Sequence, residues 1–495
     1  MTEEVPTSET ARRASAAMQS ARTAFDGWSG IDPTERSACI ERMRRKIVLD
    51  RDEIVRTICA EAGKTRAEAL SSDVLPTLEM LRYLEREMAR ILEPRKAKTP
   101  LVFGRASSRV EYRPRGVVVV IAPWNNPFQL SLVPAAFALA AGNTVVLKPS
   151  PLARKTAALV GRLCEEAGLI QDALQVEDGG AETALALIAE QPDLVFFTGG
   201  PAGGRAVLEA AARHLIPVIL ELGGKDPMIV LADADLERVE QAAVYGAFTH
   251  AGQHCVSTKR LLVEKPIYGT LLDRIANLTR SLTETGEWGR VVDERAMAAA
   301  AEQVREAVAD GARLVVPDDL DRAGAEPTLV SDCSPSMRLV QEETFAPVLA
   351  VLPFETDAEA VEMANDSPFG LNASVWSGDA ARADDVVGRL RTGNACVNNV
   401  LINIGNPHLP FGGVKASGFG RYHGPEGLRA FCVETSVLAS RSRRRTEPNW
   451  FPHDDNMAEM TDELIELRYG EMSRWQRLTG WIRVGRKLTR RGKNL

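Results

Sequence analysis

Residues 116–121 read Gly-Val-Val-Val-Val-Ile, an uninterrupted apolar run that predicts a strand buried on both faces of a parallel sheet. A second apolar run at 145–148 follows a segment over 130–141 that predicts a helix. Two further runs, at 194–197 and 218–220, continue this alternation of strands and helices. The alternation predicts an α/β fold with a doubly wound sheet, which binds a nucleotide at the carboxyl ends of its strands.

The regions on either side of this sheet carry different patterns. Candidate strands at 228–231, 260–263 and 349–352 predict a second α/β series. Before the first sheet, residues from about 8 to 90 predict helices with one core-facing side, because leucines recur at helical spacing at positions Leu75, Leu78, Leu81 and Leu84. Residues 94–114 break the helical pattern and predict an extended excursion such as a hairpin.

The bulk composition is that of an ordinary globular chain. With 495 residues, two or three domains are expected. The net charge of −7 gives no argument for a nucleic-acid partner. The seven cysteines are scattered and odd in number, which argues against a disulfide framework or a zinc site and favours a reducing cytosol. The N-terminus lacks the features of a signal peptide, and no apolar run is long enough to span a bilayer, so a soluble cytoplasmic protein is expected.

Cys255 is a candidate nucleophile. It follows Ala-Gly-Gln-His at 251–254 and lies downstream of Glu221, which begins the run Glu-Leu-Gly-Gly-Lys. Only the thiolate attacks carbonyl groups, and a carboxylate that reaches it could act as its base. Most lone cysteines are small buried hydrophobes, so the local spacing alone leaves both interpretations open. For His254 we expect a packing or channel-wall role, because neighbours in sequence often point apart.

Other candidate site residues follow the predicted strands. Asn125, in the turn PWNNPF, could donate a hydrogen bond to an oxyanion, although an asparagine in a proline-rich turn usually serves only the turn itself. The glycine-rich segment 198–204 opens a helix whose amides could face a pyrophosphate, but it does not fit GxGxxG. Lys148 could meet a ribose or phosphate, or be a solvated lysine, and Glu343 is ambiguous alone. The glycines of 410–421 suggest close backbone packing.

Seven segments, taken together and in order, resemble the NAD(P)-dependent aldehyde dehydrogenase superfamily. They are PWNNPF, VVLKPS, FTGG, LELGGK, GQHC, EETFAPV and PFGGVKASGFGR, and the resemblance covers about residues 10–437. Each motif is weak to moderate by itself, whereas seven in the right order with fitting separations are specific. The implied fold has a Rossmann-like NAD(P)-binding domain, an α/β catalytic domain and a small β arm for oligomerisation. The NAD(P)-binding domain is expected at 1–93 and 115–222, and the catalytic domain at 223–414. The arm is expected at 94–114 and 415–437, and a basic C-terminal extension follows at 438–495.

The resemblance implies an enzyme that oxidises an aldehyde to a carboxylic acid with NAD or NADP. Cys255 would form a thiohemiacetal and then a thioester, and Glu221 would activate the hydrolytic water. Asn125 and the Cys255 backbone amide would make the oxyanion hole. The implied cofactor-binding residues are Trp124, Lys148, Gly199, Gly200, Gly204, Leu222, Glu343 and Phe345, and no metal is implied.

One departure from the family pattern bears on the cofactor. Pro151 stands three residues after Lys148, where NAD-preferring members often carry a glutamate, and Arg154 and Lys155 follow it. Loss of that carboxylate removes repulsion against a 2′-phosphate, so we expect dual use of NAD and NADP. A solvated first helical turn explains the two cations equally well.

The C-terminal extension and the arm suggest further partners. Between 474 and 493 the chain has eight basic residues, no acidic ones, and interleaved apolar residues that include Trp475 and Trp481. Such a tail can lie in an anionic membrane interface; a helix docked on a partner subunit and a disordered basic end are the alternatives. The tail resembles those of members that act on long apolar aldehydes, which favours a hydrophobic substrate. The 94–114 excursion resembles the family's subunit-bridging arm and implies a homodimer or homotetramer.

Two other functions remain as alternatives. In a CoA-acylating semialdehyde dehydrogenase, CoA rather than water releases the acyl group; such enzymes commonly lack the base, so Glu221 favours hydrolysis. A catalytically inactive scaffold on the same fold is the second alternative. The intact set of Cys255, Glu221 and Asn125 argues against it.

Overall fold

The computed structural model describes residues 8–100, 103, 106–442, 447, 449–451, 453 and 455–494, and the side chains of the last helix as far as Lys487. The side chains of three tail cations, Arg490, Arg491 and Lys493, therefore lie outside the described part. The chain divides into two compact units. One comprises Met1–Glu93 with Tyr112–Glu434, and the other Pro94–Glu111 with Thr435–Leu495.

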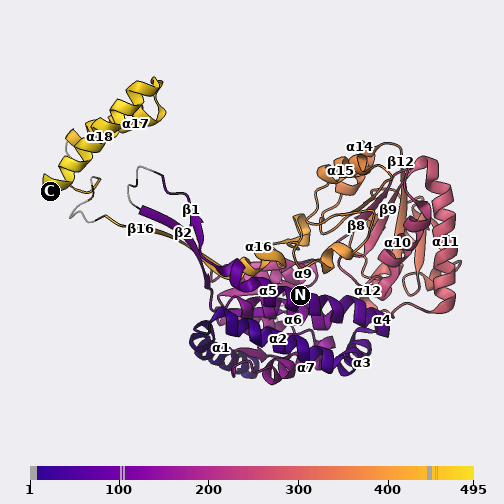
Figure 1. Ribbon diagram of the computed structural model, residues 1–495. Coiled ribbons are helices and arrows are strands. Elements are labelled where there is room, and N and C mark those ends of the chain that lie inside the picture. Colours follow the sequence, from indigo (N-terminus) through magenta and orange to yellow (C-terminus); the bar gives the residue numbers. More distant parts are fainter. Residues whose placement is uncertain are drawn as a thin grey trace. The chain divides into compact units, whose positions relative to one another are not determined.

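The first unit, coloured from indigo to orange in Figure 1, contains a six-stranded sheet built from the apolar runs. Its strands, in spatial order, are β15 (Gly418–Phe419), β7 (Val218–Glu221), β6 (Leu194–Thr198), β3 (Val117–Ile121), β4 (Thr144–Lys148) and β5 (Leu174–Val176). All neighbours pair in parallel except β15, which is antiparallel to β7. Every residue of β3, β4 and β6 is buried, as expected for a sheet covered on both faces.

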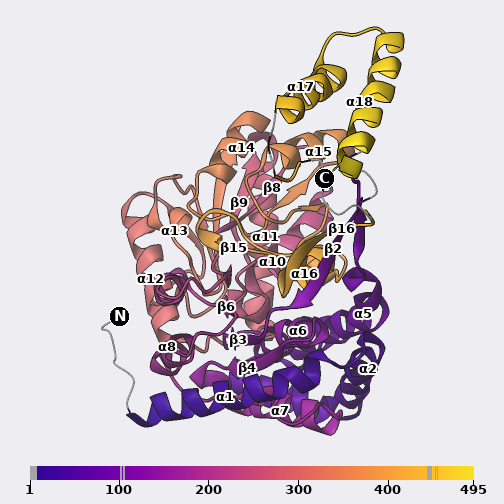
Figure 2. The ribbon, with the colours of Figure 1, turned by 90° about the vertical axis from the view of Figure 1, so that its left-hand side faces the viewer.

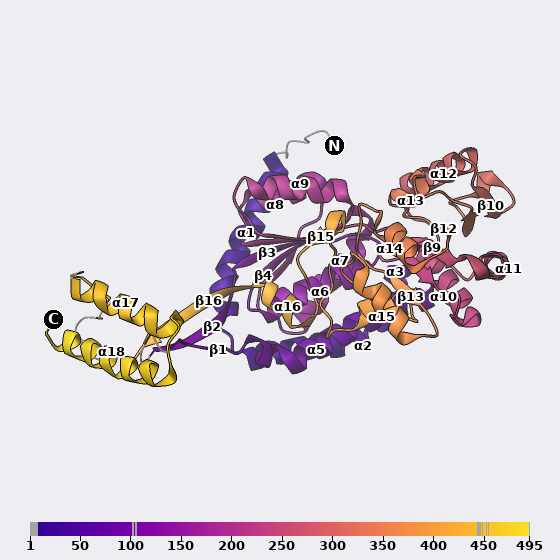
Figure 3. The ribbon, with the colours of Figure 1, turned by 90° about the horizontal axis from the view of Figure 1, so that it is seen from above.

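Alternate residues of β3 pack into two different cores, which shows that the sheet is covered on both faces (Figure 3). Val117 and Val119 share a core with α1 (Ser8–Ser29), α8 (Ala181–Ala189) and α9 (Pro201–Ala212). Val118 and Val120 share the other with α2 (Pro33–Leu49), α5 (Leu75–Leu92), α6 (Pro127–Ala140) and α7 (Arg154–Glu166). The predicted doubly wound α/β fold is confirmed.

The N-terminal helices contain one irregular turn. After α3 (Arg51–Ala62) and α4 (Arg66–Ala69), residues Leu70–Val74 form a π-helical turn, and α5 follows directly. Leu81 and Leu84 are buried as predicted, whereas Leu75 is 56% exposed, so its assignment to the core-facing side was wrong. A π turn holds an extra residue, and the helical phase at Leu75 therefore differs from that of a regular helix.

The same unit contains a second sheet, which has seven strands. Its order is β10 (Arg313–Val316), β11 (Thr328–Ser331), β12 (Val348–Phe354), β9 (Thr258–Glu264), β8 (Asp226–Val230), β13 (Ser374–Trp376) and β14 (Cys396–Val397). Only β10 is antiparallel to its neighbour. The associated helices are α10 (Leu236–Phe248), α11 (Tyr268–Thr285), α12 (Glu294–Ala309), α13 (Arg338–Gln341), α14 (Asp357–Asn365) and α15 (Ala380–Arg389). Helix α16 (Gly424–Ala430) instead packs against α5 and α6 of the first sheet. The predicted strands at 228–231, 260–263 and 349–352 correspond to β8, β9 and β12.

The second unit holds a small sheet and a pair of helices. The sheet has the order β1 (Arg95–Ala97), β2 (Ala106–Pro114) and β16 (Cys432–Ser440), and β1 and β2 are antiparallel, as the predicted hairpin requires. Helices α17 (Asp455–Tyr469) and α18 (Arg474–Asn494) pack against each other (Figure 2). Met460 and Leu467 of α17 and Val484 of α18 are buried between them.

Candidate active site

The segment before Cys255 has an unusual backbone that its neighbours hold in place. After α10, His250 and Ala251 adopt positive φ angles of 51° and 53°, which are uncommon for residues other than glycine. The His250 amide donates to Glu68 Oε1 at 2.6 Å, and Lys259 Nζ donates to the carbonyl of Gly252 at 2.8 Å. Cys255 emerges from this loop partly exposed, whereas five of the other six cysteines are buried.

Asn125 is fixed against the same loop. Its Nδ2 donates to the carbonyl of Gln253 at 2.9 Å. Gln253 is itself buried and bonded, since its Nε2 donates to the carbonyls of His250 and Arg290, both at 3.0 Å. A primary amide carries two N–H groups, so Asn125 keeps a second donor that could serve an oxyanion.

Glu221 ends β7 as a buried carboxyl group without a hydrogen-bond partner among the described residues. Burial raises its pKa well above the ordinary value, and Arg421 opposes this shift. Unpaired buried carboxyl groups are costly, and they concentrate where a protein needs a tuned acid or base. Its charge is also felt at Cys255, whose thiol pKa is raised by burial and by the carboxylates of Asp226, Glu221 and Glu343.

The glycines after Glu221 permit close approaches that any larger side chain would block. A Cβ on Gly223 would lie 2.1 Å from the Glu343 carboxylate, and one on Gly224 would lie 2.6 Å from the carbonyl oxygen of Cys255. The Leu222 amide donates to the carbonyl of Ser417 at 3.0 Å. This segment therefore brings Glu343 and the backbone of Cys255 up against the end of β7.

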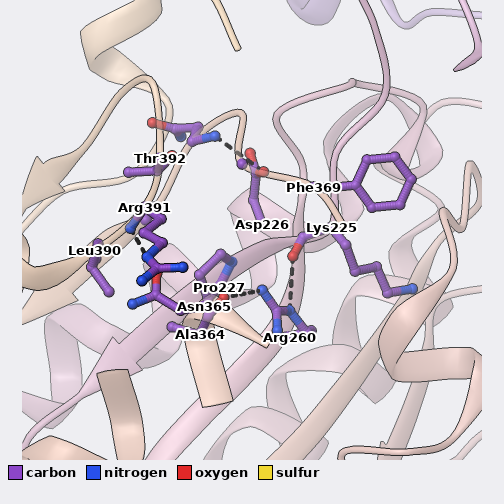
Figure 4. A pocket seen from close by; sticks show the side chains of 13 residues that line it. Lys225, Asp226, Pro227, Arg260, Ala364, Asn365, Phe369, Leu390, Arg391 and Thr392 are labelled. Atoms are coloured by element: carbon purple, nitrogen blue, oxygen red, sulfur yellow. Dashed lines mark hydrogen bonds between the residues drawn. The ribbon is translucent and has the colours of Figure 1, made fainter. Parts of the chain in front are cut away.

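Lys225 and Asp226, which follow this segment, and Arg260 are buried charged residues that line a small pocket (Figure 4). Arg260 Nε donates to the carbonyl of Lys225 at 2.8 Å, and Asp226 Oδ1 accepts from the Asn372 amide at 3.1 Å. They border a cavity of about 10 Å³, which has room for one water molecule. Burial lowers the pKa of Lys225 and raises that of Asp226. These residues were not predicted as a set from the sequence, although Asp226 and Arg260 stand at buried strand positions where apolar residues are usual.

The carboxyl ends of four adjacent strands carry several of the predicted catalytic and cofactor-binding residues. In the spatial order β7, β6, β3 and β4, these strands lead into Glu221, Gly199, Trp124 and Lys148 respectively. Lys148 is buried, and burial lowers its pKa while the carboxylates of Glu182 and Asp178 oppose the shift. The structure therefore places these residues along one edge of the sheet.

The glycine-rich turn at this edge could accept a cofactor. A Cβ on Gly199 would lie 2.6 Å from Phe197, and one on Gly204 would lie 2.6 Å from Leu222, so both glycines allow tight packing of the turn. Gly200 caps α9, whose first amides are suited to an anion. Thr198 Oγ1 is buried and has no partner within the described part of the chain. The N-terminus of α9, together with the unpaired Thr198 hydroxyl beside it, is therefore suited to a nucleotide.

The remaining predicted residues surround the Cys255 loop. The rings of Trp124 and Phe345 meet edge to face, with centroids 5.8 Å apart. Burial raises the pKa of Glu343 to about 7, and Lys225 and Lys259 oppose the shift. In the described residues, no group of three or more His, Cys, Asp or Glu side chains could hold a metal ion.

Comparison with known proteins identifies the family. The family model described as "Aldehyde dehydrogenase family" matches residues 2–437. A 4,4′-diapolycopene aldehyde oxidase from Methylomonas sp. is 43% identical over 455 residues, which cover 91% of this chain and 86% of the relative. A protein from Mycolicibacterium smegmatis with the provisional name succinate-semialdehyde dehydrogenase (NADP(+)) is 34% identical over 443 residues. The matched residues cover 87% of this chain and 85% of the relative.

Solved structures agree. The NAD-dependent aldehyde dehydrogenase of Sinorhizobium meliloti has a TM-score of 0.83 at 33% identity, and 89% of each chain is covered. The Mycobacterium tuberculosis aldehyde dehydrogenase complexed with NAD+ has a TM-score of 0.81 at 32% identity, with coverage of 87% of this chain and 90% of that one. The chain is thus an oxidoreductase that acts on an aldehyde group with NAD or NADP. The chain belongs to the aldehyde dehydrogenase family, and the resemblance seen in its sequence is confirmed.

Proposed function

We propose that the chain oxidises a hydrophobic aldehyde to its carboxylic acid through a thioester on Cys255, which water hydrolyses with Glu221 as base. The observation that carries the proposal is the buried Glu221 carboxyl group: it has no hydrogen-bond partner among the described residues, and its charge acts on Cys255. In this proposal residues 1–93 and 115–222 bind the cofactor, and residues 223–414 provide the catalytic domain. Residues 94–114 and 415–437 form the bridging arm.

The residues divide the chemistry between them. Cys255 gives up its proton to solvent and its sulfur forms a bond to the carbonyl carbon, while the second N–H of Asn125 and the Cys255 amide stabilise the oxyanion. Loss of a hydride from this carbon to the bound NAD or NADP leaves a thioester on Cys255. Glu221 then takes a proton from water, whose oxygen attacks the thioester. The carbon–sulfur bond breaks, the acid leaves, and the proton on Glu221 returns to the Cys255 thiolate. Lys148, Glu343, Trp124, Phe345, Leu222 and the turn with Gly199, Gly200 and Gly204 hold the cofactor in this scheme.

A CoA-acylating activity would use the same thioester but release it to a thiol. Glu221 supports hydrolysis because a base is needed for water and not for a thiolate. Products formed with and without CoA distinguish the two activities. Free acid in both reactions supports hydrolysis, whereas an acyl-CoA product and a strict need for CoA would contradict it.

For the cofactor, we expect use of both NAD and NADP. Pro151 in place of an acidic residue supports this, although Arg154 is engaged in an ion pair with Asp178 at 3.0 Å. Relatives with NAD and with NADP in their names both occur. The kcat/KM values for the two cofactors decide the question: a preference for NAD above about a hundredfold, about 2.7 kcal/mol, would contradict dual use.

A hydrophobic substrate is supported by the relative at 43% identity, which is named for a polyene aldehyde. Relatives at lower identity are named for succinate semialdehyde, a small acidic substrate. A panel of aliphatic aldehydes of increasing length, an aromatic aldehyde and succinate semialdehyde separates these possibilities. A kcat/KM that rises with chain length is expected, and a maximum at succinate semialdehyde would refute the proposal.

The helix pair α17–α18 supports peripheral contact of a cytoplasmic enzyme with a membrane. None of the helices in the described part of the chain has the length and apolar character needed to cross a bilayer. On α18, Trp475, Leu478 and Ile482 share one face at helical spacing and are 76%, 55% and 51% exposed. Arg483 and Arg486 are exposed on the same helix, whereas Gly480 and Val484 are buried. An apolar strip bordered by arginines fits an anionic lipid interface.

Vesicle binding tests the membrane proposal. Replacement of Trp475, Leu478 and Ile482 together by alanine should abolish co-sedimentation with vesicles that contain phosphatidylglycerol. Leu215→Ala, at another highly exposed apolar position, is the matched control and should bind like the wild type. Unchanged binding of the triple variant, or equal binding to neutral vesicles, would contradict the proposal.

The arm supports a homodimer or homotetramer. Strand β16 is the edge of the three-stranded sheet, and within the described residues only one of its sides is paired. An open edge of nine residues is suited to pairing with a second copy of the chain. Light scattering on the wild type and on Thr435→Pro in β16 tests this: a wild-type monomer, or a variant with the wild-type mass, would contradict assembly through this edge.

A further inference from the structure

A buried polar chain connects the segment around Lys64 to the residue before Cys255. Lys64 and Asp73 are fully buried and form an ion pair. Lys64 Nζ also donates to Ser72 Oγ at 2.8 Å and to Asn126 Oδ1. Asn126 Nδ2 lies 3.1 Å from His254 Nδ1. The chain therefore runs from a cation, through one amide, to an imidazole.

The acceptors around Lys64 require its ammonium form. The Ser72 hydroxyl donates its one proton to the carbonyl of Glu68 at 2.7 Å, so Ser72 can only accept a hydrogen bond from Lys64. Asp73 accepts the Gln129 amide through its other oxygen at 3.0 Å, which ties it to the first turn of α6. Three acceptors need three protons on Nζ, and only the charged amine has three. Burial lowers the Lys64 pKa, but Asp73 opposes the shift.

This proton count determines how Asn126 and His254 are oriented. Because Lys64 can only donate, Asn126 must turn its oxygen toward Lys64 and its amide nitrogen toward His254. His254 Nδ1 must then be the acceptor, and the neutral ring carries its proton on Nε2. The ring stays neutral since burial and the nearby Lys64 and Lys259 hold the pKa of His254 well below its usual range.

The neighbouring residue, Asn125, makes a similar contact with the loop before Cys255. Asn125 bonds to Gln253, and Asn126 bonds to His254, so two successive amides after β3 meet two successive residues before the nucleophile. Glu68, four residues after Lys64, adds the bond to the His250 amide. The loop that presents Cys255 is thus held from two segments of the chain at three points.

We propose that Asn126 is a positioning residue for Cys255. Asn126 joins Lys64 to His254, fixes the His254 tautomer that carries its proton on Nε2, and thereby holds the Cys255 loop in place relative to Asn125. This inference rests on the proposed role of Cys255 as the nucleophile. It extends that role, because Asn126 and His254 would act on the reaction only through the geometry of the loop.

Asn126→Asp tests the proposal with almost no change in shape. The carboxylate still accepts from Lys64 but has no N–H for His254, so the ring must move its proton to Nδ1 or become charged. Nitrogen NMR of protein with labelled histidines should show one ring change its tautomer or charge state. The rate of the first NAD(P)H formed should fall roughly tenfold or more, since small misplacements of reacting groups are costly, while KM for the aldehyde changes less than about threefold. Asn277→Asp, on the exposed surface of α11, is the matched control and should leave both readouts unchanged.

A double-mutant cycle with His254→Ala tests whether Asn126 acts through the histidine. If it does, the double variant should be no slower than the slower single variant; independent effects that multiply would overturn the proposal. An unchanged histidine spectrum in Asn126→Asp, or an unchanged first-turnover rate, would also overturn it. Failure of the proposed function is distinct, because the wild type itself would then form no NAD(P)H from any aldehyde of the panel.

Discussion

Replacement of Glu221 by glutamine should separate the two halves of the reaction. The substitution keeps the shape of a buried side chain that has no hydrogen-bond partner among the described residues, but it removes the group that can take a proton from water. General-base catalysis contributes about 10²–10⁴-fold, or about 2.7–5.5 kcal/mol of barrier. A loss of about 10²-fold, the lower end of this range, is the expected minimum.

Rapid mixing with aldehyde and cofactor measures both phases. The variant should release one NAD(P)H per active site at a rate near that of the wild type and then turn over about a hundredfold more slowly. The pH dependence should change as well. Burial raises the Glu221 pKa, so the basic form, and with it wild-type hydrolysis, grows as pH rises through that pKa, and the variant should lack this rise. A variant with wild-type steady-state turnover, or one that loses the burst as well, would refute the assignment of Glu221 as the base.

Three further predictions concern the single residues Lys148, Gly480 and Glu221. Lys148→Ala removes the buried cation at the end of β4, so KM for the cofactor should rise about tenfold with kcat little changed, and equal loss in kcat would contradict a binding role. Gly480→Val should separate α17 from α18, because even a Cβ there would lie 2.0 Å from Leu467, and faster proteolysis within 455–494 measures this. Gly485→Val is the control, since a Cβ there would meet no atom of the described part of the chain within 4 Å. The folded Glu221 binds its proton more tightly than the unfolded chain, so its stabilising contribution is lost as pH rises from near 4.5 through the folded pKa. The melting temperature of Glu221→Gln should therefore rise relative to the wild type between pH 5 and pH 8, and a constant difference would contradict the raised pKa.

Continuous apolar runs made the main strands predictable. The runs that begin at Val117, Val145, Leu194 and Met228 have no polar interruption, and each became a buried strand of a parallel sheet. The short strands β5, β10, β11, β13, β14 and β15 have two to four residues each and were not predicted. Pairing with longer neighbours supplies the stability that their own sequences do not signal.

Site residues that stand in sequence motifs could be predicted, whereas hydrogen bonds between residues far apart in the sequence could not. Glu221 and Cys255 stand in motifs, and their order along the chain was informative. The bond from Lys64 to Asn126 joins residues 62 positions apart, and that from Asn126 to His254 spans 128, so neither leaves a local pattern. His254 was expected to pack or line a channel; the structure shows a buried ring held by an amide, which depends on a partner far away in the sequence.

The acyl-enzyme itself offers the most direct test of the central claim. Glu221→Gln, mixed with a good aldehyde and cofactor and quenched in acid, should carry one acyl group, which adds the mass of the aldehyde less two hydrogen atoms. Peptide mass spectrometry should place that group on Cys255, and Cys255→Ser in the same background should carry none. An adduct on Cys59, the other partly exposed cysteine, or the absence of any adduct while NAD(P)H is formed, would contradict covalent catalysis at Cys255.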